Sequence, residues 1–194
     1  MGGALSLHTV HLRIHAPMAG DVVVEWQEST LGGAPSTLPL KATAGGFWTG
    51  SFTAAEGAHY WLRADDGPAL VDPSCRDLVV TPEGPRSVVR APWLASPQGA
   101  PHTEGAVVYE LHVKGFGGSY LGCIEHLDHV VASGATVIEL MPVHPFDDTD
   151  NYWGYMPIVW GAVHRGYATE PHRAAEELAA LVAAAHERGL HVWI

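Results

Sequence analysis

Lysine is scarce in this chain: it occurs twice in 194 residues, as Lys41 and Lys114. The 10 basic residues face 21 acidic ones, which gives a formal net charge of −11. Because affinity for nucleic acid rests on clustered Lys and Arg side chains, this balance argues against a nucleic-acid partner. An acidic surface with little lysine suits a ligand that is neutral or cationic.

Cysteine is equally scarce, and Cys75 and Cys123 form no CxxC pair and no zinc-type spacing with histidine. The sequence therefore predicts reduced thiols and no metal site, and the lack of a GxGxxG or P-loop motif predicts no cofactor. No segment approaches the ~18 consecutive apolar residues of a membrane span, so no membrane partner is expected. Without a recognisable secretory signal, a cytoplasmic location is the expectation. No feature indicates an oligomeric state.

Residues 1–95 predict short strands separated by Gly and Pro. Apolar and polar residues alternate with a period of two in VHLRI at 10–14, and DDG at 65–67 is typical of a hairpin turn. Several short strands at close spacing favour an antiparallel β-sandwich. Residues 72–104 are rich in Pro and Gly and predict a connector, with residues 96–105 as the linker between two domains.

Residues 106–194 have a different pattern, in which short apolar runs of strand length alternate with segments whose apolar residues have helical spacing. This order is typical of βαβ units on a parallel sheet. The expected elements are a strand at 106–112, a helix at 120–133, a strand at 136–141, a helix at 171–188 and a strand at 190–194.

The connection between residues 141 and 170 is about 30 residues long, whereas the usual length is ~2–6. In parallel α/β folds, ligands bind beyond the carboxyl ends of the strands, and this loop leaves such an end. It contains DNYWGYMP at 150–157, with the only asparagine of the chain and three aromatic residues in four positions. The loop therefore predicts a substrate site.

Aromatic faces with polar neighbours suit sugars, because the C–H face of a pyranose stacks on Tyr or Trp while polar groups bind its hydroxyls. The alternative is that the aromatic residues form the loop's own small core, and composition alone favours that explanation. The candidate faces are Tyr152, Trp153, Tyr155, Trp160 and Tyr167, and the candidate polar groups are His144, Asp147, Asp148, Asp150 and Asn151.

Four blocks of the second half resemble the start of the catalytic barrel of the α-amylase superfamily, glycoside hydrolase family 13, and most of all its bacterial glycogen-debranching, isoamylase-type branch. They are VVYELHVKGF (107–116), GATVIELMPVHPF (134–146), NYWGYMP (151–157) and LAALVAAAHERGLHVWI (178–194). TVHLRIHAP, GGFWTGSF, YWLRADDG and VDPS resemble the family 48 carbohydrate-binding module that precedes such barrels. The resemblance implies a β-sandwich followed at 106–194 by three strands and two helices of a TIM (β/α)8 barrel.

The resemblance also implies a site. The second Tyr of the aromatic-Gly-Tyr motif, here Tyr155, stacks under the sugar at the cleavage subsite in this family. Asn151, Tyr152 and Trp153 would shape the same pocket, and His144 completes the expected substrate-binding set. Glu110 and Glu139 correspond to structural positions inside strands and are not a catalytic pair.

The implied activity is hydrolysis of an α-glucan, at α-1,6 branch points of glycogen or a limit dextrin, through a glycosyl-enzyme intermediate. The catalytic Asp, Glu and Asp of the family would follow residue 194, so the chain is expected to be an N-terminal fragment that is inactive alone, with no catalytic residue of its own.

Two alternatives stay open. The short segment GFGGSY (115–120) is closer to branching enzymes and to malto-oligosyltrehalose trehalohydrolases. The chain could also be a non-catalytic glucan-binding module, with Trp26, Trp48 and Trp61 as its sugar platform. Trp61 alternates with Tyr60 and Leu62, so one face of that strand is expected to point outward.

Overall fold

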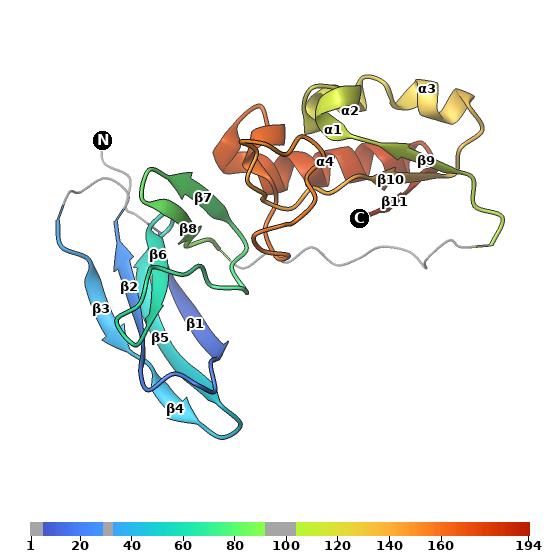
Figure 1. The fold of residues 1–194 in the computed structure, drawn as a ribbon. Helices are drawn as coiled ribbons and strands as arrows, with labels where there is room; N and C mark the ends of the chain where they lie inside the picture. Colours follow the sequence, from blue (N-terminus) through green and yellow to red (C-terminus); the bar gives the residue numbers. More distant parts are fainter. Residues whose placement is uncertain (1–5, 29–32, 92–103) are drawn as a thin grey trace. The chain divides into compact units, whose positions relative to one another are not determined.

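The computed structural model describes residues 6–28, 33–91 and 104–194, and it divides the chain into two compact units, Met1–Leu94 and Ala95–Ile194 (Figure 1). The predicted linker at 96–105 lies almost wholly outside the described residues.

The first unit contains two antiparallel sheets whose side chains face each other. Phe52 of one sheet contacts Trp26 and Tyr60 of the other, with ring centroids 4.8 and 5.4 Å apart. Leu12, Val24 and Leu62 add buried apolar surface to this unit, which makes the interior a hydrophobic core. One sheet has the order β1 (Leu7–His15), β5 (Phe47–Ala55), β4 (Lys41–Thr43); the other has the order β3 (Ser36–Pro39), β2 (Val22–Gln27), β6 (His59–Ala64), β8 (Gly84–Val88), β7 (Leu78–Thr81).

Local sequence explains several of these elements. In β1, Leu12 and Ile14 are buried while His11 and Arg13 are exposed, so the alternation predicted from sequence is confirmed. After β6, Asp65 and Asp66 both adopt positive φ, 52° and 57°, which is the backbone of a type I′ turn. The Gly67 N–H donates to the Ala64 carbonyl at 2.8 Å and closes this turn. The turn predicted at 65–67 is therefore present.

The prediction of a connector at 72–104 is wrong for residues 78–88. β7 and β8 form a hairpin there, and β8 also pairs with β6 through His59 and Tyr60. Pro85 is tolerated because it lies in the part of β8 that pairs with β7 but not with β6. The proline content of this segment therefore led to the prediction of a connector where a strand is present.

The three tryptophans proposed as a sugar platform are packed against the protein. Trp26 stacks on Phe52, and the Trp48 indole N–H donates to the Ala16 carbonyl at 3.0 Å. Trp61 is buried, donates to the Glu25 carboxylate and lies under the Arg86 guanidinium. Tyr60 and Leu62 are buried as well, so the prediction that one face of β6 points outward is wrong. Phe52 of the facing sheet covers Tyr60, while Glu25 and Arg86 of the neighbouring strands cover Trp61.

The second unit is built on a parallel sheet in which β10 (Val137–Leu140) lies between β9 (Val108–Leu111) and β11 (His191–Trp193). Helices alternate with these strands, as the apolar spacing predicted. α2 and α4 pack against each other, and α4 also contacts β11. The helices are α1 (Val113–Phe116), α2 (Tyr120–Ile124), α3 (Leu127–Ala132) and α4 (Ala174–Glu187), with 3₁₀ turns η1 (Arg165–Tyr167) and η2 (Pro171–Arg173).

The helix expected at 120–133 is broken into α2 and α3. Leu127 and Val130 are fully buried, but Leu121 and Val131 are exposed, so the apolar residues do not form one continuous stripe. The helix expected at 171–188 is present as η2 and α4, which directs Leu178, Leu181 and Ala185 into the core. Within the described ranges, no helix is both long and apolar enough to cross a membrane.

Candidate functional site

The long loop between β10 and α4 is fixed at its far end by a buried carboxylate. Glu177 of α4 accepts hydrogen bonds from the Thr169 backbone N–H (2.9 Å), the Thr169 hydroxyl (2.6 Å) and the Glu170 N–H (2.8 Å). Burial raises the pKa of Glu177, but these hydrogen bonds together outweigh it and hold the pKa below its usual range. These hydrogen bonds therefore hold the end of the loop in a defined position against α4.

The NYWGYMP segment folds around its asparagine and its glycine. Asn151 accepts from the Gly154 N–H at 3.2 Å through Oδ1 and donates to the Tyr155 carbonyl through Nδ2. Gly154 has φ +85°, and a Cβ there would lie 2.9 Å from the Pro142 carbonyl oxygen. Only glycine satisfies both constraints. The single asparagine of the chain thus shapes the turn that presents the aromatic residues.

The aromatic residues of the loop fall into two groups. Tyr152, Trp153 and Tyr155 are 50, 54 and 55% exposed. Tyr167, in contrast, is buried and contacts the rings of Phe146 and His164. The interpretation of the loop aromatics as a small core therefore holds for Tyr167 but is wrong for the three residues of the NYWGYMP segment. Trp160, further along the loop, is also exposed.

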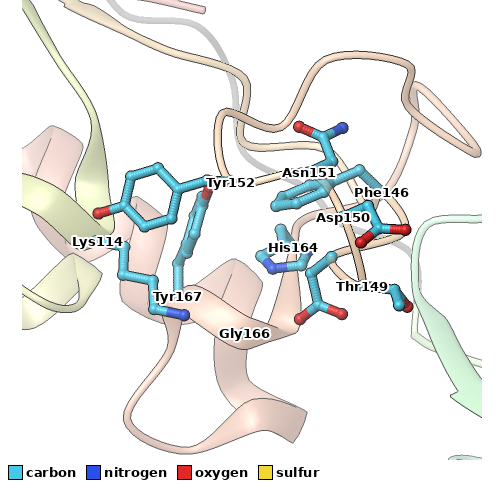
Figure 2. Close-up of a pocket in the computed structure, with 10 residues that line it drawn as sticks. Lys114, Phe146, Thr149, Asp150, Asn151, Tyr152, His164, Gly166 and Tyr167 are labelled. Atoms are coloured by element: carbon cyan, nitrogen blue, oxygen red, sulfur yellow. The ribbon is translucent and has the colours of Figure 1, made fainter.

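A pocket of about 240 Å³ lies beyond the carboxyl ends of β9 and β10 (Figure 2). One wall comes from Lys114, just after β9, and the rest comes from the loop that follows β10. Two of the predicted substrate-binding residues, Asn151 and Tyr152, line it. The complete lining is Lys114, Phe146, Asp148, Thr149, Asp150, Asn151, Tyr152, His164, Gly166 and Tyr167.

The other three predicted residues do not line this pocket. Trp153 packs edge-on against His112 and Tyr152, with ring centroids 5.6 and 5.3 Å apart. Tyr155 is exposed on the same turn. His144 is half-buried, its Nδ1 lies 3.3 Å from the Ala162 carbonyl oxygen, and its ring meets Trp160 edge-on. Their roles toward a ligand stay predictions.

Sequence reasoning missed Lys114 and His164, which line the pocket, and His112, whose ring contacts Tyr152 and Tyr167. The available signal was position, because His112 and Lys114 directly follow a strand of the parallel sheet. His164 stacks on Phe146 with centroids 4.3 Å apart, and burial lowers its pKa to about 4, against the opposing effect of Asp148. Burial also raises the pKa of Tyr167 to about 12. Both groups are therefore neutral near pH 7.

The pocket combines hydrogen-bonding groups of several kinds with aromatic surface. Asp148 and Asp150 offer carboxylates, Lys114 an ammonium and Asn151 an amide, next to the rings of Tyr152 and Tyr167. This combination suits a polyhydroxylated ligand, which needs both donors and acceptors beside an apolar face. Among the residues that the structure describes, no group of three or more His, Cys, Asp or Glu side chains could hold a metal ion.

No family model matches the chain. The chain is 35% identical over 169 residues to a malto-oligosyltrehalose trehalohydrolase of Mycobacterium tuberculosis, which covers 80% of this chain and 27% of that protein. It is 32% identical over 114 residues to the chloroplastic isoamylase SU1 of Zea mays, covering 47% of this chain and 14% of the isoamylase. The chain thus spans about a quarter or less of these relatives.

Solved structures give a consistent result. A pullulanase variant from Paenibacillus barengoltzii, crystallised with maltotetraose, superposes with a TM-score of 0.72 at 26% sequence identity. The match covers 99% of this chain and 37% of the pullulanase chain. Both units therefore have counterparts in an enzyme of this type.

Proposed function

We propose that this chain, a homologue of the glycoside hydrolases of the α-amylase superfamily (family 13), forms one wall of a cleft that binds α-glucans. The observation that carries the proposal is the pocket at the carboxyl ends of β9 and β10, which adjoins the exposed aromatic turn 152–155. The maltotetraose bound to the pullulanase relative supports a malto-oligosaccharide as ligand.

The architecture belongs to the same proposal. The two facing antiparallel sheets would be a β-sandwich of the family 48 carbohydrate-binding type, and β9, β10 and β11 the first three strands of a (β/α)8 barrel. The parallel order β9-β10-β11 with intervening helices supports this assignment. A cytoplasmic location is proposed because both cysteines are buried free thiols.

The proposed reaction of the enzyme is hydrolysis of α-1,6 branch linkages in glycogen or a limit dextrin, as the debranching relatives suggest. A retaining glycosidase needs two carboxylates ~5–5.5 Å apart on either side of the scissile bond. The pocket carboxylates, Asp148 and Asp150, both come from one short segment and do not supply opposite sides. We therefore expect the 194 residues to bind glucan without releasing reducing sugar.

A specific observation favours a second candidate, a trehalohydrolase. The relatives that cover 80 and 92% of the chain are malto-oligosyltrehalose trehalohydrolases, whereas the isoamylase match covers 47%. Product analysis of an enzyme that contains this chain separates the candidates, because trehalose is released in one case and linear maltodextrin in the other.

The binding step is tested by titrating the 194-residue chain with maltotetraose in a calorimeter. Tyr155→Ala should weaken the Kd about three- to tenfold, because it removes a stacking face. Leu121→Ala, which removes an exposed apolar side chain from α2 of the same unit, is the matched control and should leave the Kd unchanged. An effect of Tyr152→Ala without any effect of Tyr155→Ala would contradict the role of Tyr155 and centre binding on the pocket.

A further inference from the structure

His112 has a defined tautomer. This buried residue follows β9 and precedes α1, and its Nδ1 accepts a hydrogen bond from the Gly115 N–H at 3.1 Å. Nδ1 therefore carries a lone pair. Burial lowers the pKa of His112, Lys114 adds to the effect, and a hydrogen bond with the Tyr152 backbone opposes it. A neutral imidazole with an unprotonated Nδ1 holds its proton on Nε2.

This tautomer fixes the direction of the next hydrogen bond. The His112 Nε2 lies 2.9 Å from the Tyr167 hydroxyl oxygen. Because Nε2 carries the only proton of the neutral ring, the histidine donates at this atom, and the Tyr167 hydroxyl oxygen shares that proton as an acceptor with the Tyr152 backbone carbonyl. A protonated Nε2 has no lone pair, so it cannot accept a hydrogen bond from the Tyr167 hydroxyl. The hydroxyl proton of Tyr167 is therefore not used in this contact.

The hydroxyl proton of Tyr167 is available to a further acceptor. Buried hydroxyl groups normally find a hydrogen-bond partner. Within the described part of the chain, the Tyr167 side chain makes one hydrogen bond, the one with His112. Tyr167 also lines the pocket, where its ring stands next to Tyr152 (Figure 2). An acceptor in the pocket would complete its hydrogen bonding.

We propose that His112 is a positioning residue that holds the Tyr167 hydroxyl as a hydrogen-bond donor toward the pocket, and that this hydroxyl binds an oxygen atom of a glucose unit. The inference rests on the proposed function and adds two residues to it. A neutral oxygen fits better than an anion, because the pocket holds the carboxylates of Asp148 and Asp150 against the single ammonium of Lys114.

The first test removes the hydroxyl. Tyr167→Phe should weaken the Kd for maltotetraose about three- to tenfold, the usual effect of one lost hydrogen bond. Tyr120→Phe is the matched control. Tyr120 is also buried and donates to the His164 carbonyl at 3.2 Å, but it does not line the pocket. Its variant should bind maltotetraose like the unmodified chain.

Two variants of His112 separate positioning from folding. His112→Asn keeps an acceptor near Nδ1 for the Gly115 N–H but does not reach Tyr167, so it should bind as weakly as Tyr167→Phe. His112→Gln places an amide N–H near Nε2 and should retain most of the affinity. In the His112→Asn background, Tyr167→Phe should cause no further loss.

A nitrogen-15 NMR spectrum of the histidine rings tests the tautomer without any ligand, and it remains informative if a His112 variant does not fold. A pyridine-type Nδ1 and a pyrrole-type Nε2 for His112 are expected. A protonated Nδ1 overturns the inference whatever the glucan affinity.

The remaining outcomes are distinct. If the unmodified chain binds maltotetraose and Tyr167→Phe binds equally well, the inference is wrong and the proposed function stands. The inference is also wrong if Tyr120→Phe weakens binding as much as Tyr167→Phe. If the unmodified chain does not bind maltotetraose, the proposed function fails and the inference fails with it.

Discussion

The two units of the chain differ in the polar side chains that adjoin their hollows. In the first unit, the Asp72 carboxylate accepts from the Tyr60 hydroxyl and from the Ser74 N–H, each at 2.8 Å, while its own N–H donates to Ser87 at 2.9 Å. In the second unit, His164 and Tyr167 line a pocket. A hollow of about 330 Å³ also adjoins Asp72 and Tyr60, but both oxygens of that carboxylate already have partners.

The difference separates structural polar groups from available ones. A buried network whose donors and acceptors are all paired makes one arrangement of the surrounding strands more stable than others. A buried hydroxyl or imidazole that faces a cavity keeps hydrogen-bonding capacity for a ligand. This difference supports the proposal that the ligand binds in the second unit, although both units have a hollow and both contain buried polar side chains.

The largest expected effect comes from removing the Asp72 carboxylate from its hydrogen-bond network in the first unit. Asp72→Ala leaves the Tyr60 hydroxyl and the Ser74 N–H without their acceptor, and should lower the free energy of unfolding of the first unit by about 3 to 4 kcal/mol. Hydrogen exchange of the β6 and β8 amides measures it. Asp66→Asn, an exposed change that keeps a side chain suited to positive φ, is the control and should change stability by less than about 0.5 kcal/mol. Equal loss of protection in β10 would contradict a stabilising role of Asp72 that is confined to the first unit.

A smaller effect is expected from the turn that presents the aromatic residues. Gly154→Ala should destabilise the second unit by about 2 to 3 kcal/mol, from positive φ and from the clash with the Pro142 carbonyl. Gly118 also has positive φ, but a Cβ there would meet no atom within 4 Å. Gly118→Ala therefore measures the cost of the backbone conformation alone, and should lower the free energy of unfolding by about 1 kcal/mol. Urea unfolding of both variants gives the two values, and equal losses would remove the clash from the explanation.

The third prediction concerns pH. Burial lowers the pKa of His164 to about 4 from its usual value of 6.5. The folded state therefore binds fewer protons than the unfolded state between these values. The stability is fully present above pH 6.5 and falls as the pH drops toward 4, by about 2 kcal/mol after allowance for solvent screening.

Urea unfolding at pH 7 and pH 4.5 measures this change. His164→Phe keeps the stacking on Phe146 but removes the titrating group, so its stability should depend less on pH over this range. If the variant loses as much stability between pH 7 and pH 4.5 as the unmodified chain, groups other than His164 cause the pH dependence, and the prediction is wrong.

Local sequence was sufficient for much of the fold. The alternation in β1, the turn at 65–67 and the strand–helix order of the second unit all follow from residues that are neighbours in the chain. The loop after β10 was also identifiable, because its length is excessive for a simple connection. Prediction failed where a strong local signal had a competing tertiary explanation, as with Pro85 in β8 and the break between α2 and α3.

The sequence by itself determined that two differently built regions follow one another, and that a long loop with three clustered aromatic residues lies beyond a parallel strand. Periodicity and backbone preference act over a few residues, so they can be read directly. Only the tertiary structure decided that Trp61 is covered, that Tyr155 lies outside the pocket and that His112 meets Tyr167, 55 positions away. Such contacts depend on how strands and loops pack, which no local pattern specifies.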